Sequence, residues 1–490
     1  MKRAAEIMML TLWLATFSSV AQQHPIKRLD GSTIEPVEVD ATITRLMRAA
    51  EVTGVAVTIF NNGDVAYQKA YGLRDKENNL PLTPDSVMTA ASFSKVAFGY
   101  LVLQLVDEKI LDLDKSVYEY LPKPLPEYAN YRDLANDPRY KKITARMLLS
   151  HTAGFPNWRY FNEDRKLNIN FEPGSRFAYS GEGIDLLQLV VETVTGKSLE
   201  DLMQGHFFQP FGMTRSSMVW QERFESDFAN GYDEYGRSLG PERRKTADAA
   251  GSMQTTPRDF ARFVQAVMRG ERLRTETREA MLTPQIQILS KYEFPSLTTE
   301  TTDANKSIRL SYGLGWGLYW SPYGEAFFKE GHDEGWRNYA VCFDASKTGI
   351  VFMTNSSNGE GIFKEMLETL LRNTYTPIEW ERYTPYDKLP PRPPLKQHKE
   401  VKVDGKVLDS YVGRYRVAPD IVLVITRGTG SHLFVQENDE PKQELAPTSD
   451  RDFFSTTADD EYTFEMDGSG RVTQMVLHTD GRDIAIKRVP

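Results

Sequence analysis

Ser92 and Lys95 have the spacing of a nucleophile and its base. The segment Ser92–Lys95 (Ser-Phe-Ser-Lys) stands where a loop meets the apolar stretch Val96–Val106, which predicts a helix buried on all sides. Side chains three residues apart on a helix share a face, so the lysine ammonium can reach the serine hydroxyl. A serine hydroxyl needs a base, and a lysine that loses solvation can accept a proton. The pattern alone equally fits a helix-capping serine followed by an ordinary lysine.

Five further phrases occur along the chain in a characteristic order. Together with Ser92–Lys95 they resemble the motifs of the serine β-lactamase and penicillin-binding-protein superfamily, especially its class C-like esterase and D-aminopeptidase branch. The resemblance covers about residues 40 to 372. The phrases are Ile143–Phe155, Phe171–Gly181 ending in Tyr-Ser-Gly, Pro210–Met213, Ala250–Thr256, and Lys329–Gly331 (Lys-Glu-Gly) with Gly335-Trp336 after it.

The resemblance implies a role for each matching residue. Ser92 attacks a carbonyl carbon and forms an acyl-enzyme, and Lys95 and Tyr179 share the proton transfers. Lys329 holds the local field positive, which is expected to lower the pKa of Tyr179. The backbone N–H groups of Ser92 and His332 are the expected oxyanion hole. Without the resemblance, Tyr179 would be interpreted as a half-buried structural tyrosine and Lys329 as an exposed lysine on a strand.

The sequence departs from the family pattern at two positions. Gly181 stands where an asparagine is expected, and Glu330 stands where a threonine is expected. Asp333 and Glu334 follow closely, so we expect an acidic rim that repels the carboxylate of a β-lactam. The rim could instead hold an ammonium, such as the free N-terminus of a peptide, or it could be a solvated acidic turn.

Several other residues are candidates for substrate binding. Gly331 and His332 follow the second lysine motif, and the backbone of His332 is expected to face the site. Trp158, with Tyr160 and Phe161 beside it, could form an aromatic acyl pocket with Trp336, or these rings could simply pack a loop. His151 is expected to be structural. The substrate-binding candidates are therefore Gly331, His332, Glu330, Trp336 and Trp158.

Composition excludes other classes of function. The 490-residue chain has a net charge of −9 and no long basic run, which makes it a poor nucleic-acid binder. Its seven histidines show no metal-ligand spacing, and Cys342 is its one cysteine, expected in the core. We expect no metal, no cofactor and no disulfide within the chain.

The first 21 residues resemble an export signal. Lys2 and Arg3 precede an apolar run, Ile7–Phe17, and Ser19–Ala21 reads as a cleavage site. The run is too short to span a membrane, and no cysteine follows it, so we expect a cleaved signal peptide and not a lipoprotein. The mature protein is expected to be periplasmic or secreted, without a membrane span.

The pattern of elements predicts an α/β (α+β) β-lactamase-like domain over residues 37–375. One antiparallel sheet, flanked by helices, is expected to combine strands from both ends of this segment, with a helical subdomain inserted between them. The expected helices cover 37–50, 96–106, 186–194, 259–268 and 362–371, and the expected strands cover 54–60, 65–71, 312–320, 326–329, 339–343 and 349–355.

After residue 375 the sequence changes from long helices and strands to a proline-rich segment and then to short strands. Six prolines in 376–399 predict a semi-rigid linker. Short strands separated by turns then predict a small barrel-like β domain over 400–490. The phrases Tyr411–Tyr415 and Asp480–Arg482 resemble the lipocalin-like domain attached to some hydrolases of this branch. This domain could shape access to the site, mediate oligomerisation or add stability.

These observations predict an exported serine hydrolase that cleaves a small peptide, amide or ester through an acyl-enzyme on Ser92. A peptidase or aminopeptidase is the first choice and a carboxylesterase is close behind, whereas β-lactamase activity should be weak. One alternative is a penicillin-binding or sensor-type protein that is acylated without turnover. Another is a degenerate fold kept for its surface. Catalytic turnover distinguishes the hydrolase from the sensor-type protein, and a complete lack of acylation would favour the degenerate fold.

Overall fold

The computed structural model describes residues 25–392, 394, 397–418, 421–438, 442–458, 460–479 and 482–490. The predicted signal peptide therefore lies outside the described residues, as does part of the phrase Asp480–Arg482. Within the described ranges, none of the helices combines the length and the apolar character that crossing a bilayer requires.

The first domain is built on a nine-stranded antiparallel sheet in the order β10-β11-β12-β13-β14-β15-β3-β4-β5. Strand β15 pairs with β3, so the two ends of the domain meet at the centre of the sheet, as predicted. The strands are β3 (Gly54–Asn61), β4 (Asp64–Asp75), β5 (Leu80–Pro81), β10 (Ile286–Gln287), β11 (Ser311–Tyr312), β12 (Gly317–Ser321), β13 (Gly324–Asp333), β14 (Trp336–Phe343) and β15 (Thr348–Thr354).

One predicted strand is interrupted. The alternation over 312–320 suggested a single strand, but the chain forms β11 and β12 as separate, paired strands. Gly315 between them has a φ of +92°, a conformation that glycine adopts without strain. The tight turn follows from this residue, which the alternation of its neighbours concealed.

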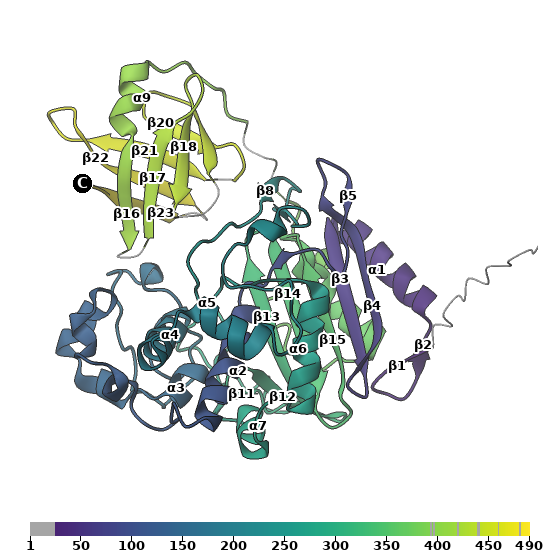
Figure 1. Cartoon of the computed structure of the whole chain (residues 1–490). Helices are drawn as coiled ribbons and strands as arrows, with labels where there is room; N and C mark the ends of the chain where they lie inside the picture. The colour runs from purple at the N-terminus through teal and green to yellow at the C-terminus, as the bar shows by residue number, and fades with distance from the viewer. Residues whose placement is uncertain are drawn as a thin grey trace, which may run out of the picture.

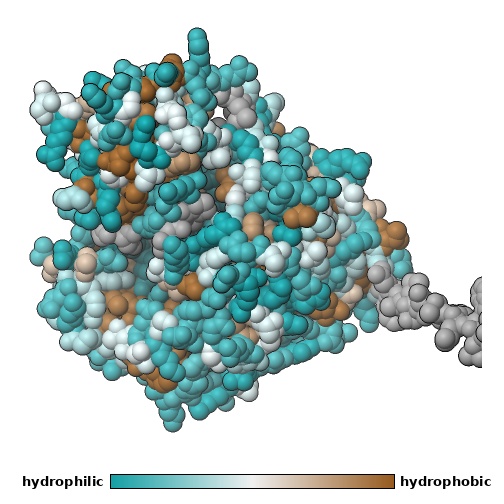
Figure 2. Space-filling view, turned by 45° about the horizontal axis from the view of Figure 1, so that its top comes forward, coloured by the Kyte–Doolittle hydropathy of each residue, from teal (hydrophilic) through white to brown (hydrophobic). Residues whose placement is uncertain are grey.

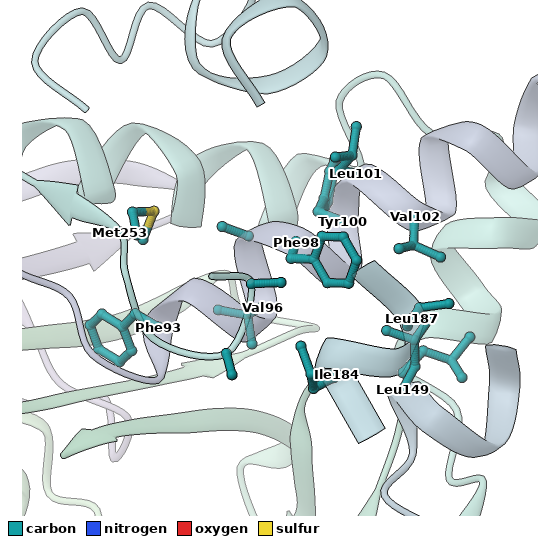
Figure 3. Packing of buried hydrophobic residues seen from close by; sticks show 14 of the residues in the cluster. Phe93, Val96, Phe98, Tyr100, Leu101, Val102, Leu149, Ile184, Leu187 and Met253 are labelled. Carbon is teal, nitrogen blue, oxygen red and sulfur yellow. The ribbon is translucent and has the colours of Figure 1, made fainter. Parts of the chain in front are cut away.

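Helices cover both faces of the sheet (Figure 1). The central helix α2 (Phe93–Asp107) is apolar all round and packs in the larger core with Leu149, Ile184 and Leu187 (Figure 3). The first helix, α1 (Pro36–Ala50), packs in a second core on the other face. The remaining helices of this domain are α3 (Ala145–Leu149), α4 (Gly181–Thr195), α5 (Leu199–Leu202), α6 (Pro257–Arg269), α7 (Thr275–Met281) and α8 (Phe363–Met366).

Short elements complete this domain. The predicted closing helix over 362–371 is divided into η8, α8 and the π-helix η9. The short strands are β1 (Ile26–Lys27), β2 (Thr33–Ile34), β6 (Met88–Thr89), β7 (Gly231–Tyr232), β8 (Ser238–Gly240) and β9 (Gln254–Thr255). The other short helices are η1 (Val117–Tyr120), η2 (Leu125–Glu127), η3 (Ala129–Asn136), η4 (Pro138–Lys142), η5 (Arg159–Phe161), η6 (Met203–Phe208), η7 (Glu222–Phe224), η8 (Gly359–Ile362), η9 (Leu367–Leu371) and η10 (Tyr386–Lys388).

The predicted linker begins as a packed segment. Ile378, Trp380 and Tyr383 are buried in the second core, and the backbone N–H of Glu293 donates to the carbonyl of Trp380 at 3.0 Å. The reading of 376–399 as extended chain from its first residue was therefore wrong. Burial of these large apolar side chains stabilises the packed path, and the flanking prolines restrict the backbone without preventing it.

The C-terminal domain is a closed, eight-stranded antiparallel barrel, which confirms the predicted β domain (Figure 1). Helix α9 (Gly405–Tyr411) precedes it, and Tyr411 and Leu408 are buried in its core. Three of its strands, β16, β19 and β20, were not predicted, because they lack a long apolar run like that of β17. The strands are β16 (Gly413–Ala418), β17 (Ile421–Arg427), β18 (Leu433–Glu437), β19 (Gln443–Pro447), β20 (Asp452–Ser455), β21 (Glu461–Met466), β22 (Val472–Thr479) and β23 (Arg482–Val489).

Candidate active site

The N-terminus of α2 brings Ser92 and Lys95 together as their spacing predicted. Ser92 is the N-cap residue, and Ala91 before it has a φ of +48°, so the chain turns sharply at the serine. The Nζ atom of Lys95 lies 3.1 Å from Oγ of Ser92 and donates to the carbonyl of Ala250 at 2.6 Å. Burial, with the charge of Lys329 next, lowers the pKa of Lys95 to about 8. A lysine of this kind can take the serine proton.

Strand β13 passes directly against the loop that carries the serine. A β carbon on Gly331 would lie 2.7 Å from the carbonyl oxygen of Ala90, so only glycine fits this approach. The side chain of Asn338 donates to the carbonyls of Thr89 and Ala90 at 3.1 and 3.2 Å, which fixes the loop to the sheet. Among the described residues the backbone N–H of Ser92 has no acceptor, which leaves this donor available to a substrate oxygen.

Tyr179 lies at the start of α4 and faces both lysines. Ser180 caps this helix by accepting from the backbone N–H of Gly183 at 2.9 Å. Lys329 donates to the Tyr179 hydroxyl at 3.0 Å. The ammonium groups of Lys329 and Lys95 lie 4.6 and 5.2 Å from the centre of the phenol ring. The four residues predicted to be catalytic therefore form one cluster, built from α2, the start of α4 and β13.

The charge of Lys329 does not act on Tyr179 as the family resemblance implied. Glu330 forms a buried ion pair with Lys329 and neutralises much of its field. Burial, followed by the charge of Glu330, raises the pKa of Tyr179 well above its usual range, although a hydrogen bond with Ser92 acts in the opposite direction. The expectation of a lowered pKa was wrong, because it took no account of the burial of the phenol or of the pairing between Lys329 and Glu330. Tyr179 is therefore a neutral phenol, and Lys95 is the stronger candidate for the base.

Trp158 occupies the place left open at Gly181. A β carbon there would lie 2.3 Å from Cη2 of the indole. The Nζ atom of Lys95 lies 5.8 Å from the indole ring, so Trp158 forms a wall beside the catalytic cluster. The loop is held by an ion pair in which Arg159 binds Glu182 of α4 through two nitrogens.

The structure separates the other predicted site residues. His332 lines the cleft with a half-exposed side chain, and Glu330 lines it from a buried position. Trp336 is buried in the larger core and does not line the cleft, so it cannot form an acyl pocket with Trp158. Asp333 and Glu334 line the cleft from outer, partly exposed positions.

His151 has a structural position. Its Nδ1 atom accepts from the backbone N–H of Ser180 at 3.2 Å, and its ring packs 4.4 Å from that of Tyr179. Burial and the charges of Lys329 and Lys95 lower its pKa well below the usual range. A neutral histidine here supports the tyrosine and carries no charge.

The site lies in a cleft of about 1490 Å³ between the first domain and the barrel of the same chain. Arg414, Val422 and Val424 of the barrel line it. The guanidinium of Arg165 donates to the barrel carbonyl of Ala485 at 2.8 Å. The lining includes eleven Asp and Glu against six Lys and Arg, so the cleft is acidic.

The face of the molecule shown in Figure 2 is mostly hydrophilic, with hydrophobic residues in separate patches.

Several carboxyl groups near the site were missed by sequence reasoning. Glu293 and Glu381 are buried close to Lys329, and burial with the charges of neighbouring carboxylates raises the pKa of each well above its usual range. Asp185, on α4, is hydrogen-bonded to Asp248, and its pKa is also raised. Asp185 shares a helix face with Gly181, a spacing that could have revealed it. The two glutamates lie in segments without periodicity. Within the described part of the chain, no three His, Cys, Asp or Glu side chains are arranged to hold a metal ion.

Comparison with known proteins decides the family. The β-lactamase family model matches residues 39–371, and a domain of unknown function, DUF3471, matches residues 397–488. The chain belongs to the β-lactamase family. Members of this family are serine hydrolases, which confirms the predicted enzyme class.

Individual relatives show the range of this β-lactamase family. The chain is 24% identical to penicillin-binding protein 4* of Bacillus subtilis over 460 residues, which covers 86% of this chain and 92% of that protein. It is 28% identical to esterase EstB of Burkholderia gladioli over 234 residues, 42% of this chain and 57% of the esterase. The octameric penicillin-binding protein homologue of Pyrococcus abyssi shares the fold, with a TM-score of 0.57 and 20% identity over 93% of this chain and all of that one.

Proposed function

We propose that the enzyme cleaves an amide or ester bond through an acyl-enzyme on Ser92. The observation that carries this proposal is the 3.1 Å contact between the Lys95 ammonium and the Ser92 hydroxyl, in a buried setting that lowers the pKa of the lysine. Neutral Lys95 accepts the proton of Ser92 while its Oγ atom forms a bond to the carbonyl carbon of the substrate. The Ser92 backbone N–H, with that of His332, receives the developing oxyanion.

Collapse of the tetrahedral intermediate breaks the bond to the leaving group. Tyr179, a neutral phenol held by Lys329, donates a proton to the departing nitrogen or oxygen and regains one from Lys95. In the second half of the reaction, Lys95 takes a proton from water, whose oxygen attacks the acyl carbon. The bond between that carbon and Oγ of Ser92 then breaks, and Lys95 returns its proton to Oγ. Each half-reaction begins and ends with the same protonation of the site.

The acidic cleft favours some substrates over others. Acidic side chains outnumber basic ones in the lining, which disfavours substrates that carry a carboxylate next to the scissile bond, as β-lactams do. A peptidase or aminopeptidase acting on small peptides suits this charge best. A carboxylesterase is the second candidate, favoured by the similarity to esterase EstB. Export to the periplasm or the medium belongs to the same proposal and is carried by the signal-like residues 1–21.

The first experiment is a time course with p-nitrophenyl acetate, with intact mass measured in parallel on the wild type and on Ser92→Ala. Steady release and a Ser92-dependent acetyl adduct are expected. A stoichiometric burst with a lasting adduct would support the alternative of a sensor that is acylated without turnover. Neither release nor adduct, in a variant pair with equal melting temperatures, would contradict the proposal.

We also propose that copies of this chain associate through the C-terminal barrel. An octameric relative suggests that copies of this chain associate, with the barrel as the expected contact. Light scattering on the full-length protein measures the mass in solution. A mass of several chains would support association, and the mass of one chain would contradict it.

A further inference from the structure

Three buried glutamates lie within electrostatic reach of the ammonium of Lys329. They come from separate parts of the chain: Glu330 from β13, Glu293 from the loop after β10, and Glu381 from the packed segment after η9. Their exposed fractions are 5%, 3% and 5%. Lys329 interacts electrostatically with both Glu293 and Glu381 and forms an ion pair with Glu330. Burial, followed by the charges of neighbouring carboxylates, raises the pKa of Glu293 and Glu381 and favours their neutral form in the free enzyme. A second cation beside them would favour their ionised form, so the cluster can accept one more positive charge.

Two oxygen atoms of this cluster lack a partner. Among the described residues, Oε1 of Glu293 and Oε1 of Glu381 are buried without a hydrogen bond, while Oε2 of Glu381 accepts from the hydroxyl of Tyr339 at 3.0 Å. All three glutamates line the cleft. A buried polar atom without a partner is destabilising. Two such atoms at one end of a cleft indicate a place where a ligand supplies the missing donors.

We propose that Glu293, Glu330 and Glu381 form a binding site for an ammonium group of the substrate. An ammonium offers three N–H donors, and oxygens on separate side chains can receive them. The rings of Phe294 and Tyr383, which are close in the chain to Glu293 and Glu381, also line the cleft and can contact the cation. Of the acidic rim that the sequence suggested, Glu330 belongs to this site, whereas Asp333 and Glu334 lie outside the buried cluster.

The site rests on the proposed hydrolase function and makes its substrate more specific. Lys329, which is paired with Glu330, also donates to the Tyr179 hydroxyl, the group that protonates the leaving group. An ammonium at this site therefore lies closer to the leaving group than to the acyl chain. The substrate is accordingly an amide or ester whose leaving amine or alcohol carries a primary ammonium.

Matched substrates test this inference. The first pair is 4-(aminomethyl)phenyl acetate and neutral 4-ethylphenyl acetate, with the ammonium on the leaving group. The second pair is β-alanyl p-nitroanilide and butyryl p-nitroanilide, with the ammonium on the acyl group. For Glu293→Gln and Glu381→Gln, the ratio of kcat/KM for the charged over the neutral substrate should fall by about 10- to 100-fold in the first pair.

Glu334→Gln is the control, because it makes the same change from carboxyl to amide in the same cleft, at an exposed position. Its ratio should stay within about twofold of the wild type. A fall confined to the second pair would move the ammonium to the acyl side and overturn the assignment to the leaving group. Equal losses on charged and neutral substrates, or a fall in Glu334→Gln alone, would overturn the site.

A binding measurement separates this inference from the proposed function. Benzylammonium chloride and benzyl alcohol are titrated calorimetrically into Ser92→Ala, in phosphate and in Tris buffer. Burial keeps Glu293 and Glu381 neutral by raising their pKa, so binding of the cation should ionise them and release protons, and the heat should depend on the buffer.

Adding Glu293→Gln to Ser92→Ala should weaken benzylammonium binding by about tenfold or more. If benzylammonium binds but no substrate is turned over, the result contradicts the proposed hydrolase function and leaves the ammonium site supported. Turnover of neutral esters without any binding of benzylammonium would overturn the ammonium site alone.

Discussion

The indole of Trp158 fills the space in which a side chain at Gly181 would lie. A β carbon on this glycine would meet Cη2 of the indole at 2.3 Å and two further ring carbons at 2.6 Å. The indole of Trp158 can therefore take this position only because residue 181 is a glycine. The departure from the family pattern at Gly181 does not leave an empty place beside Lys95, since an aromatic wall takes its position.

This relationship predicts that Gly181→Ala disturbs the site. The indole is rigid and must move, which alters the surroundings of Lys95, so kcat/KM should fall by about tenfold or more. Gly205→Ala is the control, because a β carbon there has nothing within 4 Å. The double variant Gly181→Ala, Trp158→Ala should lose less than the two single losses combined. Independent, additive losses would contradict this relationship.

The depressed pKa of Lys95 predicts how the rate depends on pH. The lysine must be neutral to accept the Ser92 proton, and its pKa is about 8. Below this pH, kcat/KM for a neutral ester should therefore rise about tenfold per pH unit, and above it the rate should level off. The pH–rate profile of 4-ethylphenyl acetate hydrolysis measures this, because the substrate does not titrate. A profile without an inflection near the pKa of Lys95 would exclude this residue as the base.

The Glu330–Lys329 pair predicts a shift in Tyr179. The negative charge of Glu330 raises the pKa of the phenol, so Glu330→Gln should lower it. Titration of the phenolate absorbance, as a difference between Glu330→Gln and the double variant Glu330→Gln, Tyr179→Phe, isolates this one tyrosine. The same difference for wild type and Tyr179→Phe gives the reference. An unchanged or higher titration point in Glu330→Gln would show that Glu330 does not control Tyr179.

The catalytic motifs and the sheet could be predicted because their signals are local. The serine and lysine share one turn of α2, and the strands β3, β14 and β15 show as short apolar runs. The pairing of β15 with β3 followed from the order of elements, since both ends of the domain are rich in strands. The charge state of Tyr179 did not follow, because it depends on how Glu330 turns toward Lys329.

The carboxyl cluster could not be predicted from pattern. Glu293 lies in a loop without regular structure, and Glu381 lies in a proline-rich stretch that reads as a linker. They meet near Lys329 because Ile378 and Trp380 pack on the sheet, and this packing is a property of the whole core. Trp336 was misplaced for the opposite reason, since a tryptophan beside a motif can as readily belong to the core as to the cleft.

The ion pair of Arg159 and Glu182 predicts a loss of stability. Nε and Nη2 of the arginine bind the two carboxylate oxygens at 2.8 and 2.5 Å, and the side chains are only 6% and 7% exposed. Removing one partner leaves a buried charge uncompensated, so Glu182→Gln should lower the free energy of unfolding by about 3–5 kcal/mol. Lys142 and Glu172 form an exposed pair with side chains 61% and 52% exposed, so Glu172→Gln should change it by less than about 1 kcal/mol. Urea unfolding of the three proteins compares these values, and a similar small loss in both variants would mean that the Arg159 pair does not hold the Trp158 loop on α4.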